Sequence, residues 1–427
     1  MLAILLISFI QMPQFALLPA TNLIATEIFP DRGLPMIQMA MSLPGLVAIF
    51  GGVSSAIMIR YGFTSKKTMT VSGLMMIVLT GITSLLLHSR FWQLCLMNTF
   101  VGVGMGIFVP SAQSIMFDNF SEKTRQFISG VSFSCINVGG LLMSLLCGFL
   151  IRYIWYGGHL QMLIAIPVVI VAILIIPKDK RVRSATEIKA LNPERSTDTE
   201  TTTISTDKAN PDSARVPGTG SAYADAPAID RARIPLKAYY YTLLIVIFMI
   251  LYNVATVNIS THLASGGFGD PSTAGIASAL LMAGGAAIGL VFPKLSQALR
   301  DNIFSLSFII MAVGYTLMNL FPASLPVTLI AMFLCGSTMS LLVPRCIFNV
   351  SNLSDPTNSA TATMLVCCVA PGSGHFLSPV IMTNLTLALG GESTQYRFQF
   401  TAFICLALAA ALLLYDLYKR RINNRIV

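Results

Sequence analysis

Charged residues are scarce in this 427-residue chain. Charged residues make up only 11% of it, and the 18 acidic residues are outnumbered by 27 basic ones. Hydrophobic residues reach 55%. Soluble globular domains carry roughly 25% charged residues, so this composition excludes an ordinary water-soluble fold and predicts a protein that lies largely in lipid.

Motifs typical of enzymes and metal sites are also missing. The eight cysteines and four histidines form neither a CxxC motif nor a Cys/His cluster with metal-ligand spacing, so we predict no metal, disulfide or cofactor. Gly267-Phe268-Gly269-Asp270 matches the GxGD motif of intramembrane aspartyl proteases, but its partner candidate, Asp416, is expected at the opposite membrane face. We therefore predict that the protein is not an enzyme.

Long apolar blocks are what the sequence does contain. Each is long enough to cross about 30 Å of hydrocarbon as a helix. The expected spans are 2–29, 36–59, 69–87, 91–117, 128–151, 160–176, 238–263, 273–295, 303–321, 325–350, 358–389 and 398–418. The predicted fold is an all-α membrane protein with 12 transmembrane helices in two six-helix bundles.

One polar stretch, 177–237, interrupts this series. It holds 11 of the 27 basic residues and nine of the 18 acidic ones. Its Ser/Thr/Pro-rich composition cannot bury enough apolar area to offset chain entropy, which predicts a disordered linker. The expected domains are therefore a bundle at 1–176, the linker at 177–237, and a second bundle at 238–427 that ends in a short basic tail.

The distribution of basic residues predicts the orientation. Connections on the linker's side carry Arg60, Lys66, Lys67, Lys123, Arg125, Lys294, Arg300, Lys419, Arg420, Arg421 and Arg425. Those on the other side carry only Arg32, Arg90, Arg152 and Arg397. We predict a multi-pass protein of the plasma membrane with both termini cytoplasmic. Because this bias accounts for the net charge of +9, no nucleic-acid partner is expected.

The chain also repeats itself at an offset of 234 residues. This register aligns Gly102 with Gly336 and Gly140 with Gly374. A register held across so many residues predicts two bundles of parallel topology that face each other. It also leaves the leader before the first helix short, which suggests a start codon further upstream.

These features resemble the major facilitator superfamily over the whole chain. Its loop signature after helix 2 is Gly-x-x-x-Asp-Arg-x-Gly-Arg-Arg, and here Ser55 replaces the glycine and Ile59 the acidic residue. The resemblance assigns a gating role to four residues of this loop, Arg60, Gly62, Lys66 and Lys67. The missing acidic residue removes an ion pair that is thought, in the family, to latch the two bundles.

The likeness to the drug/proton antiporters of this family is partial. Their helix 5 pattern, Gly-x8-Gly-x3-Gly-Pro-x2-Gly-Gly, keeps three glycines here, but Met143-Ser144 replaces Gly-Pro, and their helix 4 arginine is absent. Close helix packing explains such small residues equally well. The predicted packing glycines are Gly102, Gly130, Gly139, Gly140 and Gly148.

In this family, polar residues of helices 1, 4, 7 and 10 line a central cavity flanked by helices 2, 5, 8 and 11. The resulting candidates are Gln11, Gln14, Asn22, Asn98, Gln113, Asn137, Asn253, Asn258, Arg345, Asn349 and His375. The first three fall on one stripe of an unbroken helix. For the amides, interhelical hydrogen bonds are the alternative explanation.

Arg345 and His375 are the candidates with ionisable side chains. An arginine suits an anionic group because it stays charged, although it can also extend to the membrane surface. His375 can carry a proton or serve as a structural hydrogen-bonding group. Since no carboxylate is expected at the midplane, the usual proton relay is missing and the coupling ion stays open.

The resemblance implies a secondary transporter that works by alternating access. We expect export of a small, mostly apolar organic solute, by a monomer in the lipid bilayer, with a proton as the candidate coupling ion. The alternative is uptake or exchange of a small organic anion that binds Arg345.

Overall fold

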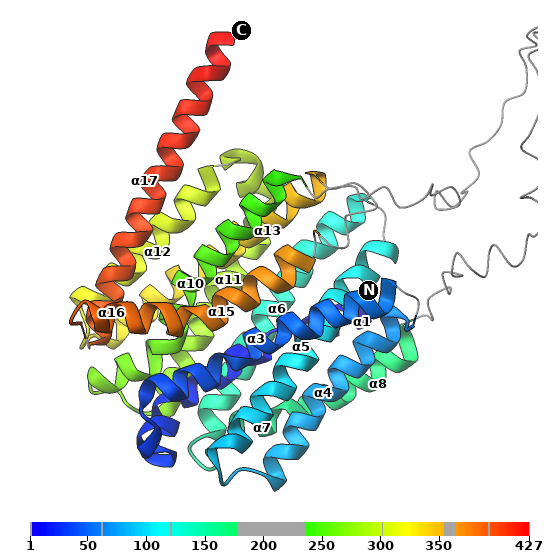
Figure 1. Ribbon diagram of the computed structural model, residues 1–427, viewed down its shortest axis with the longest axis vertical. Helices are drawn as coiled ribbons and strands as arrows, with labels where there is room; N and C mark the ends of the chain where they lie inside the picture. Colours follow the sequence, from blue (N-terminus) through cyan, green and yellow to red (C-terminus); the bar gives the residue numbers. More distant parts are fainter. Residues whose placement is uncertain are drawn as a thin grey trace, which may run out of the picture. The chain divides into compact units, whose positions relative to one another are not determined.

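A computed structural model describes residues 2–60, 63–119, 122–176, 235–300, 302–353, 362, 364–391 and 393–426 (Figure 1). These residues belong to one compact unit. The expected linker lies outside the described residues except for 235–237, so the division into domains stays a prediction. We call 2–176 the N-terminal half and 235–426 the C-terminal half.

Long helices make up both halves. The N-terminal half contains α3 (Leu34–Arg60), α4 (Lys66–Leu86), α5 (Phe91–Asn119), α6 (Glu122–Leu150), α7 (Gly157–Leu160), η4 (Gln161–Ile164) and α8 (Ala165–Ile175). The C-terminal half contains α10 (Leu236–Ser265), α11 (Pro271–Leu299), α12 (Asn302–Leu320), α13 (Leu325–Leu353), η6 (Leu365–Val369), α15 (Ala370–Ser378), η7 (Pro379–Thr383), α16 (Asn384–Ala388) and α17 (Thr394–Ile426). Among the described residues, 11 helical stretches are long and apolar enough to cross a membrane, and they match the second to twelfth expected spans.

The first expected span, 2–29, is not one continuous helix. It is divided into α1 (Leu2–Ser8), η1 (Pro13–Ala20), α2 (Thr21–Leu23) and η2 (Ile24–Ile28). Pro13 begins η1 and Pro19 lies inside it. Because proline lacks a backbone N–H and its ring clashes with the preceding turn, the chain changes helix type here. The expectation that Gln11, Gln14 and Asn22 share a stripe of one helix is therefore wrong.

In each half, a glycine allows two helices to pack closely against each other, and the two pairs of helices are equivalent in the repeat. A Cβ added to Gly102 on α5 would lie 2.8 Å from Val47 Cβ on α3. A Cβ added to Gly336 on α13 would lie 1.6 Å from the Leu281 carbonyl oxygen on α11. The offset of 234 residues that relates Gly102 to Gly336 also relates Val47 to Leu281. The same packing thus occurs at the repeat register that we found in the sequence.

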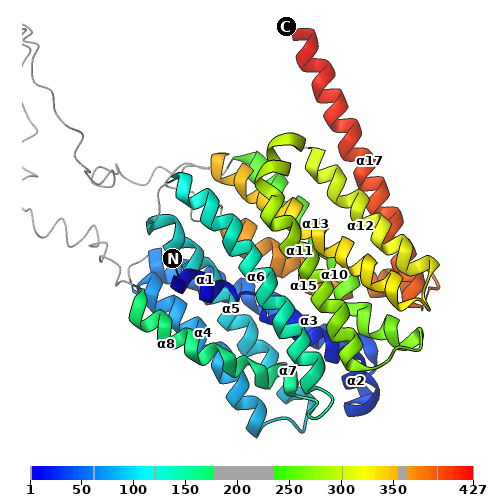
Figure 2. The same cartoon turned by 180° about the vertical axis from the view of Figure 1, so that it is seen from behind.

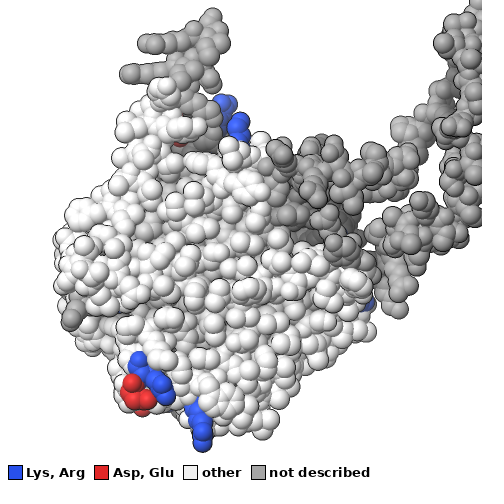
Figure 3. All heavy atoms as spheres, viewed as in Figure 1, with Lys and Arg blue, Asp and Glu red and all other residues white. Residues whose placement is uncertain are grey.

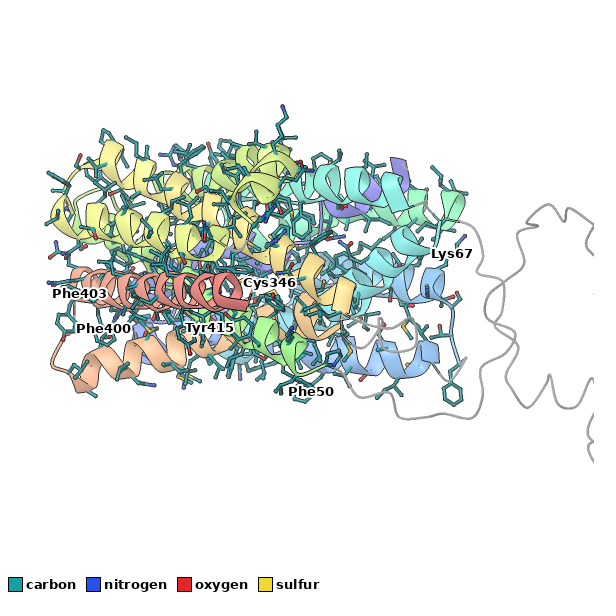
Figure 4. The ribbon with its side chains drawn as sticks, turned by 90° about the horizontal axis from the view of Figure 1, so that it is seen from above. Phe50, Lys67, Cys346, Phe400, Phe403 and Tyr415 are labelled. Atoms are coloured by element: carbon teal, nitrogen blue, oxygen red, sulfur yellow. The ribbon has the colours of Figure 1, made fainter. Side chains whose placement is uncertain are left out.

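The helix ends and their connections form two opposite faces of the molecule. The terminal face carries the connections α3–α4, α5–α6 and α11–α12, and the loop face carries α4–α5, α6–α7, α10–α11 and α12–α13 (Figures 1 and 2). On the side shown in Figure 3, charged residues lie near the ends and the surface between them is uncharged. Phe50 and Phe403, labelled in Figure 4, are 65% and 62% exposed. Such an apolar surface suits contact with lipid tails.

Candidate functional site

The middle of the interface between the halves contains a buried histidine–asparagine pair. His375 Nδ1 on α15 lies 2.8 Å from Asn253 Oδ1 on α10, and Asn253 Nδ2 donates to the Met249 carbonyl oxygen at 2.7 Å. With Oδ1 as acceptor, His375 Nδ1 carries the proton. His375 Nε2 is then an acceptor, and it is buried without a hydrogen-bond partner. Phe15 of η1 packs edge-on against the same ring, with centroids 5.7 Å apart.

Nearer the loop face, a second polar cluster joins the halves. Gln38 Nε2 on α3 donates to Asn258 Oδ1 on α10 at 3.0 Å, and Arg397 Nη1 on α17 donates to the same oxygen at 2.9 Å. Thr383 Oγ1 on η7 donates to Gln38 Oε1 at 3.4 Å. We call Gln38, Asn258, Thr383 and Arg397 the loop-face cluster. All four side chains are buried.

Arg397 departs from its sequence-based placement. We expected it in a connection between two helices, but it lies inside α17 and is 4% exposed. The expected span began at Phe398, where the apolar run starts. The helix begins earlier because Ser393 Oγ accepts a hydrogen bond from the Tyr396 backbone N–H at 3.1 Å, as an N-cap residue does. That capping serine was the signal that could have placed Arg397 in the helix.

The broken first helix uses its freed backbone groups to contact the other half. Ser260 Oγ on α10 donates to the Pro19 carbonyl oxygen at 3.2 Å and accepts from the Asn22 backbone N–H at 3.3 Å. Gln14 Oε1 is buried without a partner. Gln11 accepts a hydrogen bond from Gln113 Nε2 at 3.4 Å within the N-terminal half.

Two candidate asparagines make different kinds of contact. Asn98 Nδ2 donates to the Ala40 carbonyl oxygen at 2.8 Å, and its Oδ1 lies 3.1 Å from His159 Nε2. Those contacts stay within the N-terminal half and satisfy the amide. Asn137 Nδ2 donates to the Phe133 carbonyl oxygen at 2.8 Å and reaches Ser340 Oγ of the other half at 3.5 Å.

The remaining candidates lie toward the terminal face. Arg345 Nη1 on α13 donates to Ser296 Oγ at 3.1 Å, and its guanidinium lies 5.7 Å from the Phe348 ring centroid. Asn349 is half-buried one turn further along. The structure thus brings Asn253 together with His375, whereas Arg345 contacts Ser296 and Phe348.

The predicted gating loop is described only in part. Gly62 and the Arg60 side chain lie outside the described residues, and Lys66 begins α4. Lys67 Nζ donates to the carbonyl oxygens of Ile173 and Ile176 at 2.7 and 2.5 Å. It therefore binds the carbonyl end of α8, where a cation is favoured.

Four of the predicted packing glycines are at close approaches. An added Cβ would meet Pro44 at Gly102, Phe9 at Gly139, Met282 at Gly140 and Gly275 at Gly148. The surroundings of Gly130 are not among those described. The last two contacts join α6 to α11, across the halves.

Comparison with known proteins decides the family. The model of the Major Facilitator Superfamily matches residues 2–232, more than half of the chain. The chain belongs to this superfamily. It is accordingly a multi-pass membrane transporter rather than an enzyme. No curated protein matches the chain in sequence.

Solved structures show the same fold for this superfamily member. An auto-inhibited POT family peptide transporter has a TM-score of 0.66 and 12% identity, with 97% of each chain covered. A POT family transporter in complex with 5-aminolevulinic acid has a TM-score of 0.66 and 13% identity, over 97% of this chain and 95% of that chain. The POT family transporter PepTSo has a TM-score of 0.66 and 12% identity, with 98% of each covered. At such identities the likeness concerns the fold alone.

An ion pair links the halves of this superfamily member at the loop face. Arg152, after α6, donates from Nε to Asp270 Oδ1 at 3.2 Å and from Nη2 to Oδ2. Asp270 also caps α11, since its Oδ1 accepts from the Ser272 backbone N–H. The hydrogen bond from Arg152 holds the pKa of Asp270 below its usual value, and the same bond raises the pKa of Arg152.

We expect the loop face to be open more often in the Arg152→Gln variant than in the wild type. The ion pair joins the two halves at this face, so maleimide labelling of a cysteine at Ser260 should become faster when the pair is removed. The control Arg90→Gln removes an exposed arginine from the same face and should leave the rate unchanged. Because the pKa of Asp270 is lowered, the contribution is complete above about pH 4 and is lost as pH falls through the folded value. An effect of Arg152→Gln that disappears between pH 8 and pH 5 would contradict this assignment.

Proposed function

We propose that the protein is a secondary transporter that moves a small organic solute across the plasma membrane by alternating access. In this proposal it has 12 spans in two bundles, the terminal face is cytoplasmic, and the monomer is the working unit. The supporting observation is that the halves meet at the loop face through separate, breakable contacts, at Ser260, in the loop-face cluster and between Arg152 and Asp270.

The strength of these contacts suits a reversible gate. Hydrogen bonds between protein groups contribute about 0.5–1.5 kcal/mol each when water can replace the partner. A handful of such contacts can be offset by the binding energy of a solute and by contacts formed at the other face. The loop face would therefore open in one state and close, as here, in the other.

Export is the direction that we propose, because the central side chains are uncharged amides, hydroxyls and one histidine, and because the helix 5 glycines partly match the antiporters. His375 Nε2, buried without a partner, is the group proposed to take up a coupling proton. The second candidate, transport of an organic anion, is favoured by the buried arginine of the loop-face cluster rather than by Arg345.

A disulfide across the loop face tests alternating access. In a cysteine-free background, Asn22→Cys and Ser260→Cys replace residues whose backbone nitrogen and Oγ are 3.3 Å apart. Oxidation should join them and abolish transport, measured as collapse of a pH gradient in proteoliposomes with panels of lipophilic cations and small carboxylates. Reduction should restore it, because only the opening of this face is prevented.

The matched control joins two residues within one half. Ser8→Cys and Ser132→Cys replace hydroxyls 2.6 Å apart in the N-terminal half, and their disulfide should leave transport intact. Equal transport by the oxidised and reduced Asn22/Ser260 protein would refute alternating access at this face.

A further inference from the structure

Arg397 is a buried cation whose charge is not neutralised by any described residue. Its side chain is 4% exposed, and the ion pairs of the described chain are Arg32–Asp31 and Arg152–Asp270. An arginine does not lose its proton in a protein. A buried charge without a counter-ion is costly, and inside a membrane protein such a residue marks a binding site or an ion pathway.

The free donors of Arg397 form a defined edge of the guanidinium. Nη1 is used by Asn258 Oδ1 at 2.9 Å. Nε–H is buried and has no hydrogen-bond partner. Nε and the η nitrogen on its own side are the pair of parallel donors that receives a carboxylate side-on. The edge that suits a carboxylate therefore contains Nε, which has no described hydrogen-bond partner, and not Nη1, which is bonded to Asn258.

This edge lies beside a contact between the two halves. Asn258, which holds Nη1, also accepts from Gln38 of the N-terminal half. The guanidinium thus adjoins the contact that must break when the loop face opens. His262, one turn beyond Asn258 on α10, packs its ring 5.1 Å from that of Phe398, the neighbour of Arg397. Its Nδ1 is a second buried atom without a partner.

We propose that Arg397 binds the carboxylate of the solute, so that the protein transports small organic monocarboxylates. This inference rests on the proposed transport function, develops its second candidate, transport of an organic anion, and names the substrate class. The carboxylate oxygens accept from Nε and the adjacent η nitrogen, while Asn258 keeps Nη1 in place. Binding at a site next to Gln38 couples the presence of the anion to the contacts that close the loop face.

The test uses the full-length protein in nanodiscs and a panel of aliphatic and aromatic monocarboxylates, each beside its uncharged primary amide. At least one carboxylate, and not its amide, should raise the Tm of the wild type and of Arg345→Gln, which removes the other candidate arginine. The same carboxylate should bind at least ten-fold more weakly to Arg397→Gln, with partial recovery in Arg397→Lys. Inorganic phosphate is included as a probe without a carboxylate.

Several results would overturn the proposal. They are no carboxylate that stabilises the wild type, equal stabilisation by the amides, unchanged binding by Arg397→Gln, or stabilisation by phosphate alone. Glu392→Gln tests whether the carboxylate of Glu392, rather than that of a solute, pairs with Arg397. Carboxylate binding that is seen only in this variant would mean that Glu392 is the partner. If carboxylates fail while the Asn22/Ser260 disulfide still blocks movement of a lipophilic cation, the transporter stands and only the substrate class is wrong.

Discussion

Asn258→Leu should lower the free energy of unfolding by about 2–4 kcal/mol in the wild-type background. The substitution keeps the volume but removes the oxygen that accepts from both Arg397 and Gln38. A buried guanidinium is left without its acceptor, and an amide N–H loses its partner. Both groups carry the full cost of desolvation, which is why the expected loss exceeds that of one ordinary hydrogen bond.

A double-mutant cycle separates this cause from simple loss of packing. In an Arg397→Leu background no buried charge loses its acceptor. Asn258→Leu should therefore lower the free energy of unfolding by about 2 kcal/mol less than in the wild type. Denaturation by SDS, followed by tryptophan fluorescence and circular dichroism, gives the four free energies. Asn253→Leu is the matched control on α10, because no hydrogen bond joins Asn253 to Arg397, and its cost should be additive within about 0.5 kcal/mol. If the coupling energy between Asn258 and Arg397 is also no larger than about 0.5 kcal/mol, the guanidinium does not depend on this amide.

The sequence predicted eleven of the twelve spans well because lipid imposes a simple rule. A helix that crosses hydrocarbon needs about 20 apolar residues and satisfies its own backbone, so the length of each run determines the element. The boundaries differ by a few residues where an N-cap residue, not hydropathy, determines where the helix begins. Asp270 caps α11 at Pro271, two residues before the apolar run was expected to begin.

The site was predicted less well because partners are a property of packing. Asn253, Asn258 and His375 stood out as polar residues in apolar runs, but nothing in their spacing showed that His375 faces Asn253 or that Asn258 faces Arg397. Gln38 was missed although it lies in the second expected span, one of those expected to flank the cavity. The break in the first helix was also missed, although Pro13 and Pro19 mark it, since proline can bend a helix as well as interrupt it.

The same broken segment leads to the second large expected effect, a contrast between adjacent glycines on α6. A Cβ added at Gly139 would lie 2.0 Å from the Phe9 carbonyl oxygen, whereas one added at Gly140 would lie 3.0 Å from Met282 Sδ. The first neighbour is backbone at the end of α1 and cannot yield without moving that segment. The second is the tip of a flexible side chain.

Gly139→Ala should therefore cost at least about 2 kcal/mol of unfolding free energy, since overpacking outweighs the roughly 0.5–1 kcal/mol that alanine gains over glycine in a helix. Gly140→Ala should change stability by less than about 1 kcal/mol, because Met282 can adopt another rotamer. Both variants make the same chemical change one residue apart, so composition and helix propensity cancel in the comparison. Equal Tm values for the two would mean that α6 does not approach Phe9 this closely. A selective loss in Gly139→Ala would instead show that α6 holds the interrupted first helix in place, and with it the Pro19 and Asn22 groups that meet Ser260.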